Sequence, residues 1–292
     1  MSLSTRWRVG AALTALATGA LGALVGAVPA TAAPATVSVS RYVLTFQADA
    51  GQANVLRLSL RADGTILVDD VVPVEPGAGC TAVPNGDGTA ATCGGDIRNL
   101  NINTGDGDDE VTDLAGKNIR VDAGEGDDSV VLAGAGQAWA ARTELVGGPG
   151  ADTLVGGAGE DHLDGGPGAD WLSGGSGIHD GVTYAGRTAA VTVDIDDGFG
   201  DDGEAGEGDT VRTDIEAVTG GAGNDRLTGS DAFNNLFGEG GDDTIFGLGS
   251  GDWIHGGGGT DSLYGGGGDD GIWGDDGDRN LLDGGPGNDE LS

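Results

Sequence analysis

The stretch "GGPGADTLVGGAGEDHLDGGPGADWLSGG", residues 147–175, decides the fold of this chain. It repeats a nine-residue unit three times without a break, and each unit carries several glycines, one aspartate and one large apolar residue. Glycine accepts φ angles above zero and leaves its carbonyl oxygen uncovered, so a glycine-rich turn can present oxygen atoms to a ligand. The apolar residues Leu154, Leu163 and Leu172 recur every nine residues, which predicts a core one residue thick.

The same unit returns elsewhere in the chain. Isolated copies are "TGDGDDEVT" (104–112) and "AGEGDDSVV" (123–131), and a second array of six successive units begins at Gly220. A nine-residue period held over so many units predicts a solenoid rather than a disordered acidic tail.

These units resemble the pattern G-G-x-G-x-D-x-U-x, with U large and apolar, of the RTX (repeats-in-toxin, hemolysin-type) calcium-binding nonapeptide family of secreted bacterial proteins. The resemblance implies an all-β fold, a parallel β-roll in which each nonapeptide gives a turn and a short strand. Two nonapeptides complete one coil. The resemblance also implies that several Ca²⁺ ions are the cofactors.

Calcium ions prefer six to eight oxygen ligands, more than one aspartate supplies, so stacked turns have to share each ion. Consecutive turns fall on opposite sides of a roll, and aspartates that share an ion therefore lie two repeats apart. The predicted pairs are Asp152 with Asp170, Asp225 with Asp243, Asp243 with Asp261, and Asp252 with Asp270.

Other turns fit this pattern less regularly. Asp161 can pair with Asp180 only if one extra residue is absorbed, and Asn234 predicts a weaker site with Asp252. Asp109 and Asp128 lie 19 residues apart, which is no multiple of nine, and ordinary turn chemistry remains an alternative for any single acid. The predicted metal-binding residues are Asp109, Asp128, Asp152, Asp161, Asp170, Asp180, Asp225, Asp243, Asp252, Asp261 and Asp270, with Gly148, Gly150, Gly157, Gly159, Gly166, Gly168, Gly257, Gly259, Gly266 and Gly268.

The N-terminal residues 1–32 read as a cleaved export signal. Arg6 and Arg8 precede the apolar stretch "VGAALTALATGALGALVGAV", and Ala30-Thr31-Ala32 offers a small-x-small cleavage site. A retained membrane anchor is the alternative. We expect a secreted, extracellular protein with no membrane span after signal cleavage.

Residues 33–96 form a small β region, in which Asp63-Gly64 between two alternating runs predicts a hairpin. Cys80 and Cys93 predict one disulfide, while half of a soft-metal site is the alternative. Irregular and then regular repeats follow over 97–180, a connecting β segment over 181–219, and the second array over 220–292.

The charge balance restricts the partners. The chain has 48 acidic and 13 basic residues, a net charge of −35, so nucleic acid and anionic membranes are unsuitable partners and cations are suitable ones. It has three histidines and neither an H-E-x-x-H nor a G-x-S-x-G motif, and we expect no enzyme. The sequence predicts a calcium-binding protein. The alternatives are an adhesion or polysaccharide-binding module that binds an extracellular polysaccharide or cell-surface polymer, and a non-catalytic relative of secreted RTX hydrolases.

Aromatic residues and one arginine stand out in the second array. Alternation along a strand predicts that these aromatic residues lie on two outer faces. One face carries Phe237, Trp253, His255 and Trp273, and the other carries Phe246 and Tyr264. Such a face predicts either a binding face for sugars or a ladder that stabilises the roll. Arg279 stands where the repeat calls for aspartate, which predicts a lost site after Asp261.

Overall fold

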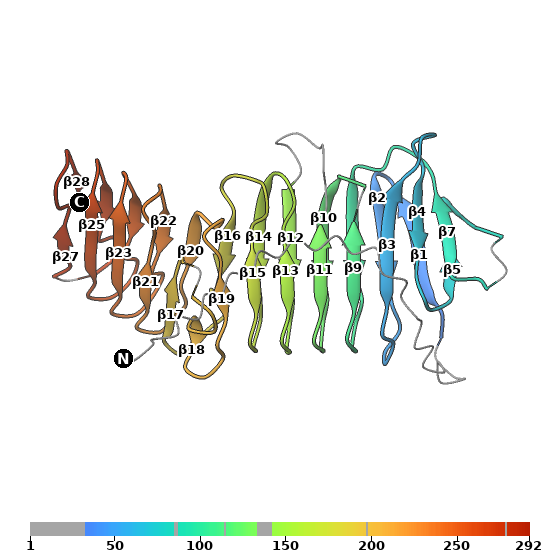
Figure 1. Ribbon diagram of the computed structural model, residues 1–292, viewed down its shortest axis with the longest axis horizontal. Helices are drawn as coiled ribbons and strands as arrows, with labels where there is room; N and C mark the ends of the chain where they lie inside the picture. The colour runs from blue at the N-terminus through green and yellow to red at the C-terminus, as the bar shows by residue number, and fades with distance from the viewer. Residues whose placement is uncertain (1–32, 85–86, 114, 133–141, 197, 278) are drawn as a thin grey trace, which may run out of the picture.

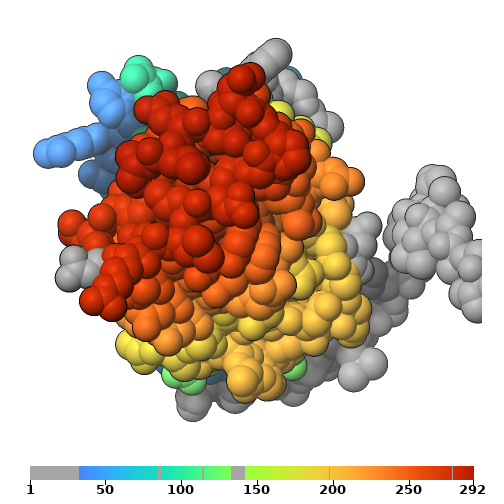
Figure 2. All heavy atoms as spheres, turned by 90° about the vertical axis from the view of Figure 1, so that its left-hand side faces the viewer, coloured from blue at the N-terminus to red at the C-terminus, as the bar shows by residue number. Residues whose placement is uncertain are grey.

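The chain winds into an elongated roll of short strands (Figure 1). This computed structural model describes residues 33–84, 87–113, 115–132, 142–196, 198–277 and 279–292, and the predicted export signal lies outside them. The described residues form three sheets and no helix, and most strand pairs are parallel, so the prediction of an all-β parallel roll is confirmed. Seen from the end where β27 and β28 lie, the last coils cover those behind them (Figure 2).

One face of the roll is a single sheet of thirteen strands, the long sheet. In order along the roll, its strands are β5 (Val74–Pro76), β1 (Ala35–Ser40), β2 (Val43–Gln47), β8 (Asn99–Asn103), β10 (Asn118–Asp122), β12 (Arg142–Val146), β14 (Glu160–Asp164), β16 (Gly181–Thr183), β20 (Ala217–Thr219), β22 (Asn235–Phe237), β24 (Trp253–His255), β26 (Gly271–Trp273) and β28 (Glu290–Leu291).

The opposite face consists of two sheets, the N-terminal sheet and the C-terminal sheet. The N-terminal sheet runs β6 (Cys80–Ala82), β7 (Ala90–Cys93), β4 (Ile66–Asp69), β3 (Val55–Leu60), β9 (Glu110–Asp113), β11 (Ser129–Leu132), β13 (Thr153–Val155), β15 (Trp171–Ser173) and β19 (Thr210–Val211). The C-terminal sheet runs β18 (Gly203–Glu204), β17 (Val191–Asp194), β21 (Arg226–Thr228), β23 (Thr244–Gly249), β25 (Ser262–Gly267) and β27 (Leu281–Asp283).

Successive nonapeptides alternate between the two faces, so each pair completes one coil. Leu145 of β12 lies opposite Leu163 of β14 in the long sheet, and Leu154 of β13 lies opposite Leu172 of β15 in the N-terminal sheet. These leucines are 0–1% exposed and belong to one continuous hydrophobic core. The core is as thin as the repeat predicts.

The N-terminal region is the first coil and cap of the roll. Strand β2 pairs in parallel with β8, and β3 with β9, so the boundary predicted at 96/97 runs through continuous sheets. The hairpin around Asp63-Gly64 is confirmed, because β3 pairs antiparallel with β4. Cys80 and Cys93 form a disulfide between β6 and β7 at the outer edge of the N-terminal sheet.

Residues 181–219, the joint, connect the two arrays. Strands β16 and β20 continue the long sheet through the joint. On the opposite face, β19 ends the N-terminal sheet and β17 pairs with β21 of the C-terminal sheet. The long sheet is therefore continuous, while the face opposite it is divided at the joint.

Candidate metal centre

Aspartates stack in rows along the edges of the roll because each one lies at the start of a strand that pairs in parallel with a strand of the next coil. The backbone N–H of Asp152 donates to Oδ1 of Asp170 at 2.9 Å, and that of Asp161 donates to Oδ1 of Asp180 at the same distance. The extra residue before Asp180 is thus absorbed. The same bond joins Asp225 to Asp243, Asp243 to Asp261, Asp252 to Asp270, Asn234 to Asp252, and Asp109 to Asp128.

There are three such rows, and each contains residues that the repeat pattern did not point to. The N-terminal row is Asn54, Asp109, Asp128, Asp152, Asp170 and Asp209. The long row is Asp161, Asp180 and Glu216, followed by Asn234, Asp252, Asp270 and Asp289. The C-terminal row is Asp225, Asp243, Asp261 and Asn280.

The second carboxylate oxygen of most row aspartates is buried without a partner. Oδ2 of Asp152 and of Asp252 has no hydrogen bond, although these residues are 1% and 0% exposed. Ten of the eleven predicted aspartates have one such oxygen, which is Oδ1 in Asp161 and Oδ2 in the others. The exception is Asp225, whose Oδ2 accepts from Gly221 N at 2.6 Å. A buried carboxylate oxygen without a donor is costly, and a cation removes that cost.

In the regular arrays, glycine keeps a space open beside the row carboxylates. A Cβ on Gly147 would lie 2.2 Å from Asp152 Oδ2 and 2.5 Å from the carbonyl oxygen of Gly165 in the next coil. A Cβ on Gly247 would lie 2.3 Å from Asp252 Oδ2 and 2.5 Å from Gly265 O. The first glycine of each unit therefore leaves room between a carboxylate and a carbonyl, a pair of oxygens that suits calcium.

The glycines named from the sequence occupy the second and fourth positions of their units, and they shape the turn. The φ of Gly148 is 109° and that of Gly150 is 154°. Gly157 is an exception without a positive φ, and its N–H donates to Asp161 Oδ2 at 2.8 Å. The others with positive φ are Gly159, Gly166, Gly168, Gly257, Gly259, Gly266 and Gly268.

Burial raises the pKa of all eleven predicted aspartates. The pKa of Asp170 rises to about 8, because burial disfavours its charge and the nearby Asp209 and Asp152 add repulsion. The pKa of Asp252 rises to about 7, again through burial and then through Asp270. A row without cations therefore holds protonated carboxyls near neutral pH.

Within the described parts of the chain, no three His, Cys, Asp or Glu side chains gather as a metal site. The rows explain this result. Neighbouring aspartates are one strand spacing apart, about 4.8 Å, so only adjacent ones can approach the same ion. Backbone carbonyls have to supply the other ligands.

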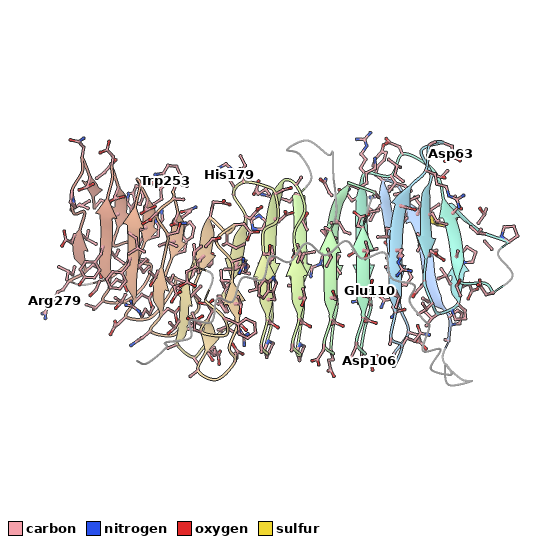
Figure 3. All side chains as sticks on the ribbon, viewed as in Figure 1. Asp63, Asp106, Glu110, His179, Trp253 and Arg279 are labelled. Atoms are coloured by element: carbon pink, nitrogen blue, oxygen red, sulfur yellow. A yellow bond between two sulfur atoms is a disulfide. The ribbon has the colours of Figure 1, made fainter. Side chains whose placement is uncertain are left out.

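Asparagine replaces aspartate at two places in the rows. Oδ1 of Asn234 accepts from Ser230 N at 2.6 Å, so this oxygen is already partnered. Asn280, not Arg279, occupies the position after Asp261, because Asp261 N donates to Asn280 Oδ1 at 2.8 Å. The predicted register, with Arg279 in the row, is therefore wrong, because one extra residue lies between Gly277 and Asn280. The φ of Arg279 is 85°. Figure 3 shows Arg279 at the periphery of the roll.

The aromatic residues lie on the two outer faces as expected. Phe237, His255 and Trp273 stack on the long sheet, with centroids 5.0 Å and 4.7 Å apart, while Phe246 and Tyr264 stack on the C-terminal sheet. Trp253 shares the long-sheet face but not the stack. It meets Phe233 edge to face and is 54% exposed.

Four copies of the family model of the RTX calcium-binding nonapeptide repeat match the chain, over residues 146–178, 219–250 and 246–281. These ranges cover the two regular arrays. The turns that hold Asp109 and Asp128 and most of the joint lie outside them. No curated protein matches the chain.

Proposed function

Since the chain carries RTX calcium-binding nonapeptide repeats, we propose that it is an exported protein whose roll folds when calcium binds, the ions being structural. The observation that carries the proposal is the set of ten row aspartates with a buried, unpartnered oxygen. In the regular steps, the ligands would be this oxygen and the glycine carbonyl of the next coil, as with Asp152 Oδ2 and Gly165 O. Calcium would supply the positive charge that these oxygens lack.

Folding and calcium binding are coupled in this proposal. The net charge of −35 opposes compaction, and the thin core supplies little burial per coil to offset it. Because the site exists only when coils stack, the free energy of binding is also free energy of folding. The two arrays are therefore expected to be largely unfolded in chelator and rolled in millimolar calcium.

Far-UV circular dichroism of the purified chain during a calcium titration tests the proposal. We expect β signal to appear cooperatively with calcium and to appear weakly with magnesium, which demands a smaller octahedral site. A full β signal in excess chelator at pH 8 would show that the ions are not needed for folding.

Export is the second part of the proposal. It is supported by the leader-like residues 1–32, by the Cys80–Cys93 disulfide, which suits an oxidising compartment, and by the secretion typical of RTX proteins. None of the described segments forms a helix with the length and apolarity to cross a bilayer. The test is expression of the full chain with its leader, followed by N-terminal sequencing of protein from the medium. We expect the chain there to start at Ala33, and an uncut chain in the membrane fraction would contradict export.

A groove on the long sheet favours a second function, binding of a neutral polysaccharide without catalysis. Gly181 and Ala217 lie side by side between His162 and Asn235, so the outer face is hollow there, with a volume of about 350 Å³. The exposed ring of Trp253 lines the groove (Figure 3).

The chemistry of this groove suits a sugar chain. An aromatic ring packs against the apolar face of a sugar, and the lining hydroxyls of Thr183 and Thr219 can bond its hydroxyl groups. Glu160 and Glu216 also line it and, with the negative net charge, disfavour anionic polymers.

Retention on insoluble cellulose, chitin and starch in calcium tests this second function. Trp253→Thr and the groove-filling Ala217→Arg are expected to abolish retention without moving the calcium midpoint of folding. Trp273→Thr, in the covered stack, is the control and is expected to weaken folding. Absence of retention for the wild type, or retention that survives Ala217→Arg, would exclude the groove as a binding site for these polymers.

A further inference from the structure

In the regular coils, the second glycine of each turn packs on its counterpart in the coil before. The carbonyl oxygen of Gly124 lies 1.9 Å from the place of a Cβ on Gly148, and that of Gly148 lies 2.2 Å from the place of a Cβ on Gly166. Each of these carbonyls is covered by the backbone of the next coil. The contact continues along the N-terminal row as far as Gly166.

The contact changes at Gly166, whose turn meets the joint. In the following turn, 203–209, all of which the structure describes, no glycine packs on Gly166 in this way. Its carbonyl instead accepts a hydrogen bond from Nη2 of Arg187. Nη1 of the same guanidinium lies 2.9 Å from Oε1 of Glu207 and 3.9 Å from Oε1 of Glu204. The Arg187 side chain is 12% exposed, so this cation is largely enclosed.

The carboxylate of this step is also partnered by the protein. Asp209 Oδ1 accepts from Asp170 N at 2.9 Å, and its Oδ2 accepts from the hydroxyl of Tyr184 at 3.1 Å. Tyr184 is 4% exposed. Asp209 thus differs from Asp152 and Asp170, whose Oδ2 atoms have no donor.

The backbone of Arg187 links the end of this row to the start of the second array. Its N–H donates to Tyr184 O at 2.8 Å, and its carbonyl accepts from Ala222 N at 2.9 Å. The C-terminal row begins at Asp225, three residues beyond Ala222. One residue therefore covers the last turn of the N-terminal row and supports the first turn of the C-terminal row.

We infer that the guanidinium of Arg187 takes the place of a calcium ion at the end of the N-terminal row, so that the joint closes without metal. It is a cation bound to the carbonyl of the second glycine of a turn and to the carboxylate of Glu207. In the regular steps, too, a turn carbonyl meets a carboxylate, although that carbonyl belongs to the first glycine and that carboxylate to a row aspartate. The inference rests on the proposed calcium-dependent folding.

Counting bound ions tests the inference, by equilibrium dialysis of the full chain in saturating calcium followed by metal analysis. Arg187→Ala leaves Gly166 O, Glu204 and Glu207 around an unoccupied space, and we expect it to bind one more calcium ion per chain than the wild type. An equal, nonzero count would overturn the inference. A count of zero in the wild type would instead overturn the proposed function.

Two further variants complete the design. Arg142→Ala removes an arginine whose pair with Glu160 is exposed, and it is expected to keep the count of the wild type. If Arg187→Ala does not fold, the double variant Arg187→Ala with Glu207→Lys tests the inference instead. Its lysine places a cation on the other member of the pair of residues 187 and 207. This double variant is expected to fold with the wild-type count, and failure to do so also overturns the inference.

Discussion

The backbone N–H of Asp252 donates to Oδ1 of Asp270 at 2.7 Å, although eighteen residues separate them in the sequence. Because most row aspartates, Asp252 among them, accept a hydrogen bond through one oxygen in this way, the other oxygen is left for an ion. Asp252→Asn keeps the hydrogen-bonding oxygen and replaces the unpartnered one with an amide NH₂. We expect its calcium midpoint for folding to rise about tenfold, which corresponds to ~1.4 kcal/mol. Circular dichroism measures the midpoint.

The control for this variant is Asp231→Asn, which removes a charge from an exposed residue of the same array. Its midpoint is expected to stay near that of the wild type. Equal shifts in the two variants would mean that overall charge, rather than the buried oxygen, determines calcium binding.

The metal-free chain is expected to gain stability in acid. The pKa of Asp152 and of Asp180 rises to about 7 in the roll through burial, against an ordinary value of 3.8. The folded state without metal therefore binds more protons than the unfolded chain. Its stability from these groups is fully present below about pH 4 and is lost as the pH rises through about 7.

Circular dichroism of dialysed, calcium-free protein between pH 4 and 8 measures this dependence. More β signal at pH 5 than at pH 8 is the expected result, and calcium binding at pH 7 should release protons. A metal-free β signal that weakens on acidification would contradict the pKa direction.

Leu248 and Ser250, in one unit of the second array, adopt a backbone conformation that favours glycine. The φ of Leu248 is 80° and that of Ser250 is 67°. These residues occupy the second and fourth positions of their unit, where the repeat pattern has glycine. A left-handed φ costs roughly 1–2 kcal/mol in an L-residue, and Leu248 is exposed, so its side chain contributes little packing. Leu248→Gly is expected to raise the Tm in saturating calcium by a few degrees.

Leu281→Gly is the matched control, because Leu281 is equally exposed but lies in strand β27. Glycine there is expected to lower the Tm, since a strand residue loses more freedom as glycine. A decrease in both variants would show that the conformation of Leu248 carries no strain.

Asn280 gives a way to extend the C-terminal row. Its amide donates to Gly274 O at 2.7 Å, so this NH₂ group occupies a carbonyl of the step after Asp261. Asn280→Asp replaces the donor with an oxygen and should lower the calcium midpoint several-fold, with Arg279→Asp as the control. If Arg279→Asp lowers the midpoint further than Asn280→Asp, the row position belongs to residue 279 after all.

The disulfide is expected to stabilise the cap rather than the arrays. Cys80 and Cys93 close a short loop at the edge of the N-terminal sheet, and their replacement by alanine should cost about 3 kcal/mol of unfolding free energy. Urea denaturation in calcium measures this cost. The calcium midpoint of folding is expected to stay unchanged, and a large shift would show that the cap and the arrays fold as one unit.

The sequence predicts the regular part of the rows well because the nine-residue period fixes which residues stack. Asp243 reaches Asp261, and Asp152 reaches Asp170, as spacing alone predicts. The prediction fails where the chain leaves this period. Asp209 lies 39 residues after Asp170, which is no multiple of nine, and Glu216 lies in the joint, which lacks the repeat pattern. Only strand pairing therefore shows which residue re-enters the row.

Short insertions cause the remaining differences. The extra residue near Asn280 could be absorbed before or after Arg279, and the sequence does not distinguish these choices. Asn54 lacks the glycine pattern altogether, yet its N–H donates to Asp109 Oδ1 at 2.6 Å because β3 pairs with β9. Such residues are fixed by tertiary pairing rather than by local chemistry.

The long sheet passes unbroken from β8 to β28, whereas the opposite face changes sheets between β19 and β17. The two sides of the rod therefore differ in the continuity of their hydrogen-bonded sheets. Stretching the unbroken side requires breaking the ladder of the long sheet. Widening the gap between the other two sheets breaks none of their ladders, but it breaks the isolated bridge of Asp202 with Asp209 and the contacts of Arg187. We therefore expect the rod to bend more easily in one direction than in the other. In the easier direction, the long sheet lies on the inside of the curve and the N-terminal and C-terminal sheets move apart on the outside.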